Sequence, residues 1–181
     1  QMCIRDSPDN DFSRVQPYLE KTLDLSRRLA DCFPGYEHIA DPLIAFADYG
    51  MTTAALGALF SELRQELVPL VEAITAQEPP DDACLFRHYP EAQQLAFGEE
   101  VVRKLGYDFQ HGRQDKTHHP FEIPIALGDV RITTRLKEND ISDGLMSTIH
   151  ESGHGMYEQG IKAEYAGTPL ANGTSSGVHE S

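Results

Sequence analysis

The run IHESGHGMYEQG, residues 149–160, places two histidines four positions apart, with a glutamate directly after the first. On an α-helix, side chains four apart lie on one face with their Cβ atoms roughly 5–6 Å apart, so His150 and His154 could bind one metal ion. Glu151 lies about 100° round the helix and would flank the ion, a position that suits a base acting on metal-bound water. The alternative is a pair of hydrogen-bonded core histidines.

A metal ion held for catalysis needs a third protein ligand beside two histidines. The run GVHES at residues 177–181 supplies Glu180, which lies 26 residues beyond His154 and is far enough along the chain to return on the next element. The alternative is that Glu180 is an ordinary exposed glutamate. We therefore expect His150, His154 and Glu180 to lie close together.

The two histidines fall inside a predicted helix that begins after Asp140, a suitable N-cap, and ends near Gly160. Gly153 and Gly155 each lower the stability of such a helix by roughly 0.5–1 kcal/mol relative to alanine, which predicts that another element approaches closely there. The residues expected to form its packing stripe are Ile141, Leu145, Ile149, Ser152 and Met156.

The first half of the chain is expected to be helical. Apolar residues recur at helical spacing over residues 11–32 and again over residues 52–76, and proline-containing runs follow both segments. A third helix is predicted from Pro90 to about Leu105, closed by Gly106.

Between residues 107 and 136 the helical spacing gives way to glycines, prolines and β-favouring residues. The run DVRITTRL, residues 129–136, alternates as a strand does, which predicts one charged face and one packing face. The charged face would carry Asp129, Arg131, Thr133 and Arg135, and the packing face Val130, Ile132, Thr134 and Leu136. The expected fold is therefore a mainly α, multi-helix domain with a small antiparallel β element around residues 108–136.

The length of 181 residues, 40% of them hydrophobic, suits one domain or part of a larger one. Residues 1–8 merge poorly with the helical pattern and are interpreted as a non-native or disordered head. Residues 9–181 are interpreted as the N-terminal and metal-site portion of a single larger helical catalytic domain, because the last residues resemble an element just beginning. The chain is thus expected to be truncated.

Acidic residues outnumber basic ones by 29 to 15, giving a formal charge of −14. Such a chain repels phosphate backbones and anionic lipid, so neither nucleic acid nor a membrane is expected as a partner. Cys3, Cys32 and Cys84 are widely separated and odd in number, which favours unpaired thiols and a reducing, cytoplasmic location.

Four ordered runs, HHPFEI, GDVRITTRL, STIHESGHGMYEQG and GVHES, resemble successive signatures of the carboxypeptidase Taq family of metallocarboxypeptidases. The resemblance covers roughly residues 36–181. It implies that His150, His154 and Glu180 are metal ligands and that Glu151 is the catalytic carboxylate. Family members are much longer, and an arginine segment linked to recognition of the substrate's C-terminus lies beyond Ser181.

The resemblance also implies that Asp129, Arg131 and Thr133 line or brace the active-site cleft. It further implies that His119 contacts either the substrate or a residue that binds the metal. Among local cations, Arg131 and Arg135 are candidates for binding a peptide's terminal carboxylate. The alternative for Arg131 is an ion pair with Asp129 or Glu138 that stiffens the strand, and for His119 a place in a proline-containing turn.

The function implied is a metal-dependent carboxypeptidase that hydrolyses peptide C-termini through a metal-activated water, with Glu151 as general base. The cofactor expected is one divalent ion, zinc in the first place, with cobalt and manganese as alternatives. The partners expected are peptide C-termini and, for the full-length protein, a second copy in a homodimer. Two other functions remain open: a thermolysin-like endopeptidase, and a helical metal-binding fragment without activity.

Overall fold

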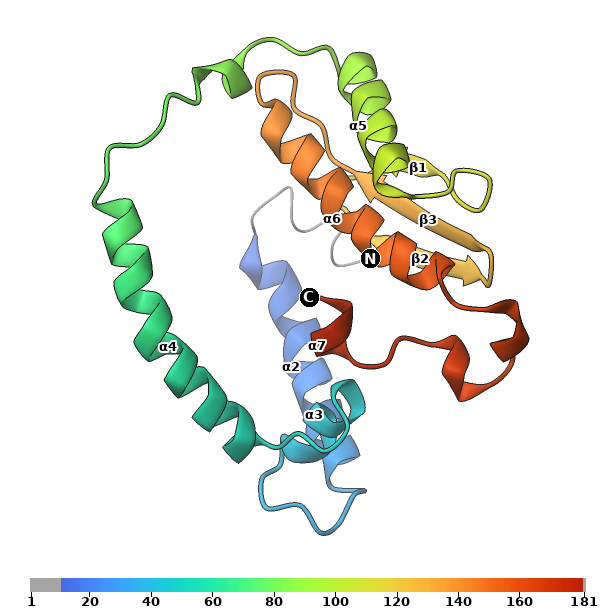
Figure 1. Ribbon diagram of the computed structural model, residues 1–181. Coiled ribbons are helices and arrows are strands. Elements are labelled where there is room, and N and C mark those ends of the chain that lie inside the picture. The colour runs from blue at the N-terminus through green and yellow to red at the C-terminus, as the bar shows by residue number, and fades with distance from the viewer. Residues whose placement is uncertain (1–10, 181) are drawn as a thin grey trace. The chain divides into compact units, whose positions relative to one another are not determined.

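The computed structural model describes residues 11–180 and shows a mainly helical chain with one small sheet (Figure 1). This confirms the predicted fold class. The chain divides into two compact units, one made of residues 11–80 and 175–177 and the other of residues 81–174 and 178–180. The predicted head at residues 1–8 lies outside the described residues, and the single larger domain over residues 9–181 stays a prediction.

The first unit holds three helices, α2 (Phe12–Ala30), α3 (Asp41–Ala47) and α4 (Thr53–Thr75). Asp11 caps α2 by accepting a hydrogen bond from the backbone N–H of Ser13, and Thr52 caps α4 by accepting one from Ala55. The predicted helices over residues 11–32 and 52–76 are therefore confirmed. The pattern did not predict α3, because seven residues cover barely two turns and show little periodicity.

The second unit carries the sheet, two long helices and several short turns of helix. The elements after residue 80 are η1 (Ala83–Phe86), α5 (Glu91–Leu105), β1 (Gln114–Lys116), β2 (Glu122–Ala126), β3 (Asp129–Thr134), α6 (Ile141–Gln159), η2 (Ala163–Tyr165), η3 (Pro169–Ala171) and α7 (Ser176–His179).

No helix within residues 11–180 has the length and apolar character needed to cross a bilayer.

The sheet has the strand order β1-β3-β2. β2 and β3 form an antiparallel pair, as expected, with Glu122 opposite Ile132, whereas β1 runs parallel to β3, with Gln114 opposite Ile132. The expected antiparallel element is thus a mixed sheet. The chain passes from one edge strand to the other before returning through the centre, an order that residue alternation alone does not reveal.

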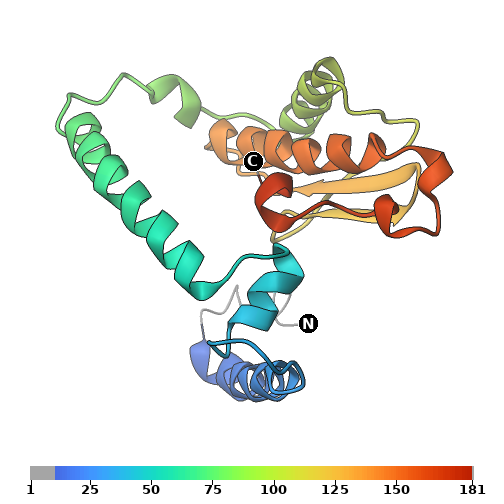
Figure 2. The ribbon, with the colours of Figure 1, turned by 60° about the horizontal axis from the view of Figure 1, so that its bottom comes forward.

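The core of this unit lies where α6 packs along the sheet and α5 packs beside α6 (Figures 1 and 2). Val102 of α5, Tyr107 and Ile132 of β3 are at most 1% exposed, and Ile149 and Met156 of α6 pack against them. The Tyr107 hydroxyl donates a hydrogen bond of 2.6 Å to the carbonyl of Val130. This core fixes α6 against β3.

The buried face of α6 differs from the predicted apolar stripe. Of the stripe residues only Ser152 is buried, and the others are partly exposed. The buried residues of the helix are instead small or polar: Gly144, Thr148, Glu151, Ser152, Gly155 and Glu158. At the two glycines a Cβ atom would lie 2.7 Å from Leu136 or from Tyr107, so no larger residue fits at those positions.

Candidate metal centre

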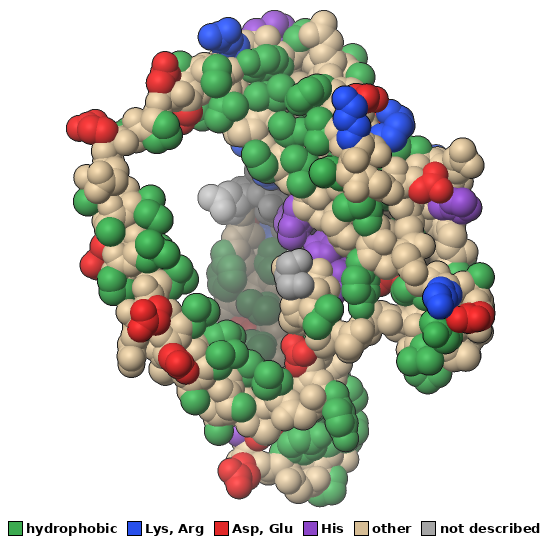
Figure 3. All heavy atoms as spheres, viewed as in Figure 1, with side chains coloured by type: hydrophobic (Ala, Val, Ile, Leu, Met, Phe, Trp, Pro, Cys, Tyr) green, Lys and Arg blue, Asp and Glu red, His purple; other side chains and the backbone are tan. Residues whose placement is uncertain are grey.

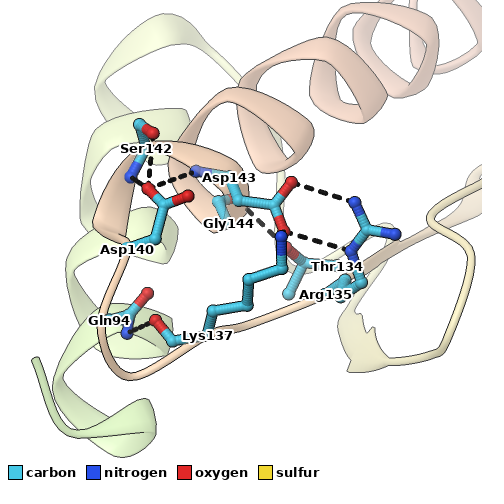
Figure 4. Close-up of polar contacts among 8 residues, drawn as sticks. All are labelled: Gln94, Thr134, Arg135, Lys137, Asp140, Ser142, Asp143 and Gly144. Atoms are coloured by element: carbon cyan, nitrogen blue, oxygen red, sulfur yellow. Dashed lines mark hydrogen bonds and ion pairs between the residues drawn. The ribbon is translucent and has the colours of Figure 1, made fainter. Parts of the chain in front are cut away.

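The start of α6 is tied to the strand before it (Figure 4). The Asp140 carboxylate caps the helix by accepting hydrogen bonds from the backbone N–H groups of Ser142 and Asp143. Asp143 in turn forms ion pairs with Arg135 at 2.9 Å and Lys137 at 3.1 Å. The helix that carries the histidines is therefore held at its first turn, and Arg135 is engaged there.

His150 and His154 lie one turn apart on α6, and their rings meet edge to face with planes 82° apart. Their Nε2 atoms are 3.1 Å apart. The Nδ1–H of His154 donates to the main-chain carbonyl of His179 at 3.1 Å, because a carbonyl can only accept. This bond selects the tautomer in which Nε2 of His154 keeps its lone pair free for a metal ion.

Glu180 joins the two histidines, as the sequence predicts. Its Oε2 lies 3.8 Å from Nε2 of His154, and one donor atom from each of the three residues lies within 4.8 Å of the others. Histidine side chains gather beside the C-terminal segment (Figure 3). The cluster opens onto a cavity of about 280 Å³ that Gly153, Tyr157 and His179 also line.

These residues fit a divalent metal ion. The 3.1 Å between the two Nε2 atoms is less than twice a zinc–nitrogen distance of about 2.0–2.1 Å, so one ion could contact both rings. Two imidazoles and a carboxylate form a common set of ligands for catalytic zinc. His150 and Glu180 are exposed, which leaves the group accessible to solvent.

Glu151 is not one of the three clustered donors, and it is buried, with 7% of its surface exposed. Burial raises the pKa of its carboxyl group, and the neighbouring His150 and His154 act in the opposite direction. Its position beside the donor cluster, but outside it, matches the flanking place predicted from helix geometry.

The two remaining predicted site residues are placed differently. His119 is exposed and is not one of the three clustered donors, although a positive charge on its ring would lower the pKa of Glu151. Arg131 points to the sheet face opposite α6, because its neighbour Ile132 packs beneath Gly155. Its guanidinium donates two hydrogen bonds to Asp129, at 2.9 and 2.7 Å, so the predicted ion pair is present and Arg131 is not brought into the cluster.

Thr133 braces the sheet from the same strand. It is buried, and its hydroxyl both donates to the carbonyl of Phe121 and accepts from the backbone N–H of that residue. The Asp129, Arg131 and Thr133 set therefore braces the hairpin and does not contact the metal ligands.

Glu122 was missed by the sequence analysis. It shares the face of Ile132 in the sheet, and burial, together with the charges of Glu158 and Glu151, raises its pKa to about 7. Alternation in the run FEIPIA would put its isoleucines inside, yet Ile123 and Ile125 are 43% and 55% exposed. The sequence held no signal for this reversal.

Comparison with known proteins agrees with the geometry. The family described as Carboxypeptidase Taq (M32) metallopeptidase matches residues 6–181. Carboxypeptidase 1 of Bacillus subtilis is 39% identical over 95% of this chain, and thermostable carboxypeptidase 1 of Thermus thermophilus is 39% identical over 96% of it. The crystal structure of the M32 carboxypeptidase from Deinococcus radiodurans R1 is 52% identical and superposes with a TM-score of 0.86 over 97% of this chain.

The chain spans only part of each of these proteins. It covers 34% of the Bacillus protein, 36% of the Thermus protein and 35% of the Deinococcus chain. Family membership follows from the match, which covers all of the described residues: the chain belongs to the carboxypeptidase Taq (M32) family of metallopeptidases.

Proposed function

We propose that a chain of the family's full length containing these residues is a metal-dependent carboxypeptidase that removes residues from peptide C-termini. The observation that carries the proposal is the convergence of donor atoms from His150, His154 and Glu180 within 4.8 Å, beside a buried glutamate. The family match supports the reaction class.

The proposed cofactor is one divalent ion, zinc in the first place, held by His150, His154 and Glu180. When bound, such an ion supplies Lewis-acid chemistry that polarises a carbonyl and makes a water molecule more acidic. One carboxylate oxygen of Glu151 accepts the proton of the attacking water and passes it to the leaving amine. Glu151 lies about 100° round the helix from His150, so its carboxylate is not one of the ligands of the ion.

We propose that His119 contacts the substrate, since it is exposed, belongs to one of the ordered family motifs and interacts electrostatically with Glu151. The two candidate arginines for binding the substrate's terminal carboxylate are already engaged in ion pairs. Arg131 and Arg135 are each paired with an aspartate. We therefore assign that recognition mainly to residues elsewhere in a full-length chain and keep Arg131 as a secondary candidate.

The test uses the full-length protein, stripped with a chelator and reloaded with zinc, cobalt or manganese in turn. Release of single amino acids from a blocked dipeptide, restored by metal, is the expected result. Internal fragments from longer peptides would show an endopeptidase instead, and metal uptake without hydrolysis would show a binding module.

A matched pair of variants ties the activity to the site. His150→Ala should weaken metal uptake strongly and abolish hydrolysis, because it removes one of the three donors. His88→Ala should leave both unchanged, because His88 is exposed and makes no polar contact among the described residues. Equal activity in the two variants would contradict the assignment.

We also propose that the full-length protein is a homodimer and works in the cytoplasm. The location is supported by Cys32 and Cys84, which are free and exposed, while Cys3 lies outside the described residues. Light scattering of the purified protein and fractionation of the cells that make it test these two proposals.

A further inference from the structure

Tyr157 follows His154 on the same side of α6 and reaches the segment that carries Glu180. Its hydroxyl accepts a hydrogen bond of 3.0 Å from the backbone N–H of Thr174 and donates one of 3.2 Å to the Thr174 hydroxyl. One phenol group therefore fixes this point of the C-terminal segment to the helix.

The ring of Tyr157 makes a second contact with the same segment. It stacks on the ring of His179, with centroids 5.0 Å apart and planes 26° apart. His179 meets the ring of His154 edge-on at 4.7 Å, and its carbonyl accepts the Nδ1–H of that histidine. Tyr157 thus touches the segment at residues 174 and 179, and the second of these directly precedes Glu180.

The His179 ring has little else to hold it. Its Nε2 is buried and has no hydrogen-bond partner among the described residues. Its position depends on packing between the rings of Tyr157 and His154. Glu180, whose side chain is 65% exposed, makes no hydrogen bond among the described residues and depends on the same neighbours.

We propose that Tyr157 is a positioning residue of the metal centre, which holds Thr174 and His179 against α6 and so keeps the Glu180 carboxylate towards the two histidines. The inference rests on the proposed metal centre. Ordering a chain segment costs conformational entropy, and a ligand already in place when the ion arrives is bound without that cost. Tyr157 supplies this order without touching the ion.

The test measures zinc affinity of the 181-residue chain by competition with a chromophoric chelator. Tyr157→Phe keeps the ring but loses both bonds to Thr174, and should weaken zinc binding about tenfold, as loss of groups that support metal ligands does. Tyr157→Leu also loses the stacking and should weaken binding further. Tyr165→Phe is the matched control, because the Tyr165 hydroxyl makes no hydrogen bond among the described residues, and its affinity should stay within about twofold of the unmodified chain.

A second measurement separates positioning from simple loss of folding. The visible absorption of the cobalt-loaded chain reports the ligands around the ion, so the spectrum of Tyr157→Leu should move towards that of Glu180→Gln. Thr174→Val, which lies outside α6, removes one of the two bonds and should weaken binding about fivefold while circular dichroism stays unchanged.

The outcomes are distinct. Unchanged zinc affinity in Tyr157→Phe and Thr174→Val, or a cobalt spectrum of Tyr157→Leu identical to that of the unmodified chain, would overturn the role of Tyr157. Failure of the unmodified chain to take up zinc would overturn the metal centre itself.

Discussion

Three glutamates, Glu122, Glu151 and Glu158, lie where α6 meets β2. Glu151 and Glu158 are 7% and 9% exposed, and burial with their two charges raises the pKa of Glu122 from 4.5 to about 7. The folded protein therefore holds a proton at Glu122 over a pH range in which the unfolded chain has lost it. The consequence is a pH-dependent stability.

Glu122→Gln should reduce that dependence, and the raised pKa of Glu151 leaves a part of it. The stability contributed by protonated Glu122 is fully present below about pH 4.5 and is lost as the pH rises through about 7, by at most roughly 3 kcal/mol, because the side chain is partly exposed. Urea unfolding at pH 5 and pH 8, with a chelator present, measures the difference. A Glu122→Gln chain that loses as much stability over this range as the unmodified chain would contradict the assignment, and Glu138→Gln at an exposed position is the control.

Glu151→Gln in the full-length protein should separate binding from chemistry. The amide cannot accept the water proton, so turnover should fall by about 10²–10⁴-fold, whereas metal affinity should persist because Glu151 is not among the three donors. Amino-acid release and zinc titration on the same sample measure the two quantities. Retained turnover would remove Glu151 from the proposed role.

At the scale of elements, α6 depends on close packing against the sheet. A Cβ atom at Gly155 would lie 2.7 Å from Cε2 of Tyr107 and 3.2 Å from Cγ2 of Ile132. Both neighbours are fully buried, and the Tyr107 hydroxyl is bonded to Val130. At Gly153 the same atom would meet nothing within 4 Å, so the close approach predicted for both glycines is present at Gly155 only.

Alanine at the two glycines should therefore have opposite effects. Gly155→Ala should destabilise the fold by about 1–3 kcal/mol through overpacking. Gly153→Ala should stabilise it by roughly 0.5–1 kcal/mol, because alanine loses less backbone entropy in a helix. Urea unfolding of the two variants without metal measures both, and equal shifts in the same direction would show that α6 is not packed as described.

The ends of the long helices were predictable because single residues mark them: Asp11, Thr52 and Asp140 cap their helices through side-chain oxygens. Which side chains of β2 point towards the interior could not be predicted. Its exposed isoleucines and inward Glu122 follow from contacts with α6, which lies distant in the sequence. The buried face of α6 was mispredicted for the same reason, since the close contacts of Gly144 and Gly155 are with residues distant in the pattern, Leu136 and Tyr107.

The candidate site shows the same division. Helical spacing and the ordered motifs placed His150, His154 and Glu180 together, which the structure confirms as a cluster. Tyr157 contacts Thr174 and His179, which lie 17 and 22 residues further along the chain. The raised pKa of Glu122 comes from its burial in the fold. Neither spacing nor composition carries that information.

At the scale of the whole molecule, the apolar surface of α4 is the largest unexplained feature. No residue of this helix is buried within the described structure, and hydrophobic side chains run along it (Figure 3). The large apolar residues exposed there are Leu59, Phe60, Leu63, Leu67, Val68, Leu70, Val71 and Ile74. A helix that is apolar on most sides normally packs against other elements, and the relatives of this chain are about three times as long.

The 181-residue chain should therefore bind a hydrophobic dye such as anilinonaphthalene sulfonate. Replacing Leu63, Leu67 and Leu70 with glutamate should lower the dye fluorescence without changing zinc affinity, because α4 belongs to the other compact unit. Equal fluorescence from both chains would show that this surface is covered.

The central claim is that two imidazoles and one carboxylate hold a single metal ion. X-ray absorption spectroscopy of the zinc-loaded chain tests it most directly, since imidazole rings give a distinctive scattering pattern. The account predicts two imidazoles with light-atom ligands at about 2.0–2.1 Å, and one imidazole fewer in His154→Ala. Sulfur at about 2.3 Å, or an unchanged spectrum after His150 and His154 are both replaced by alanine, would contradict it.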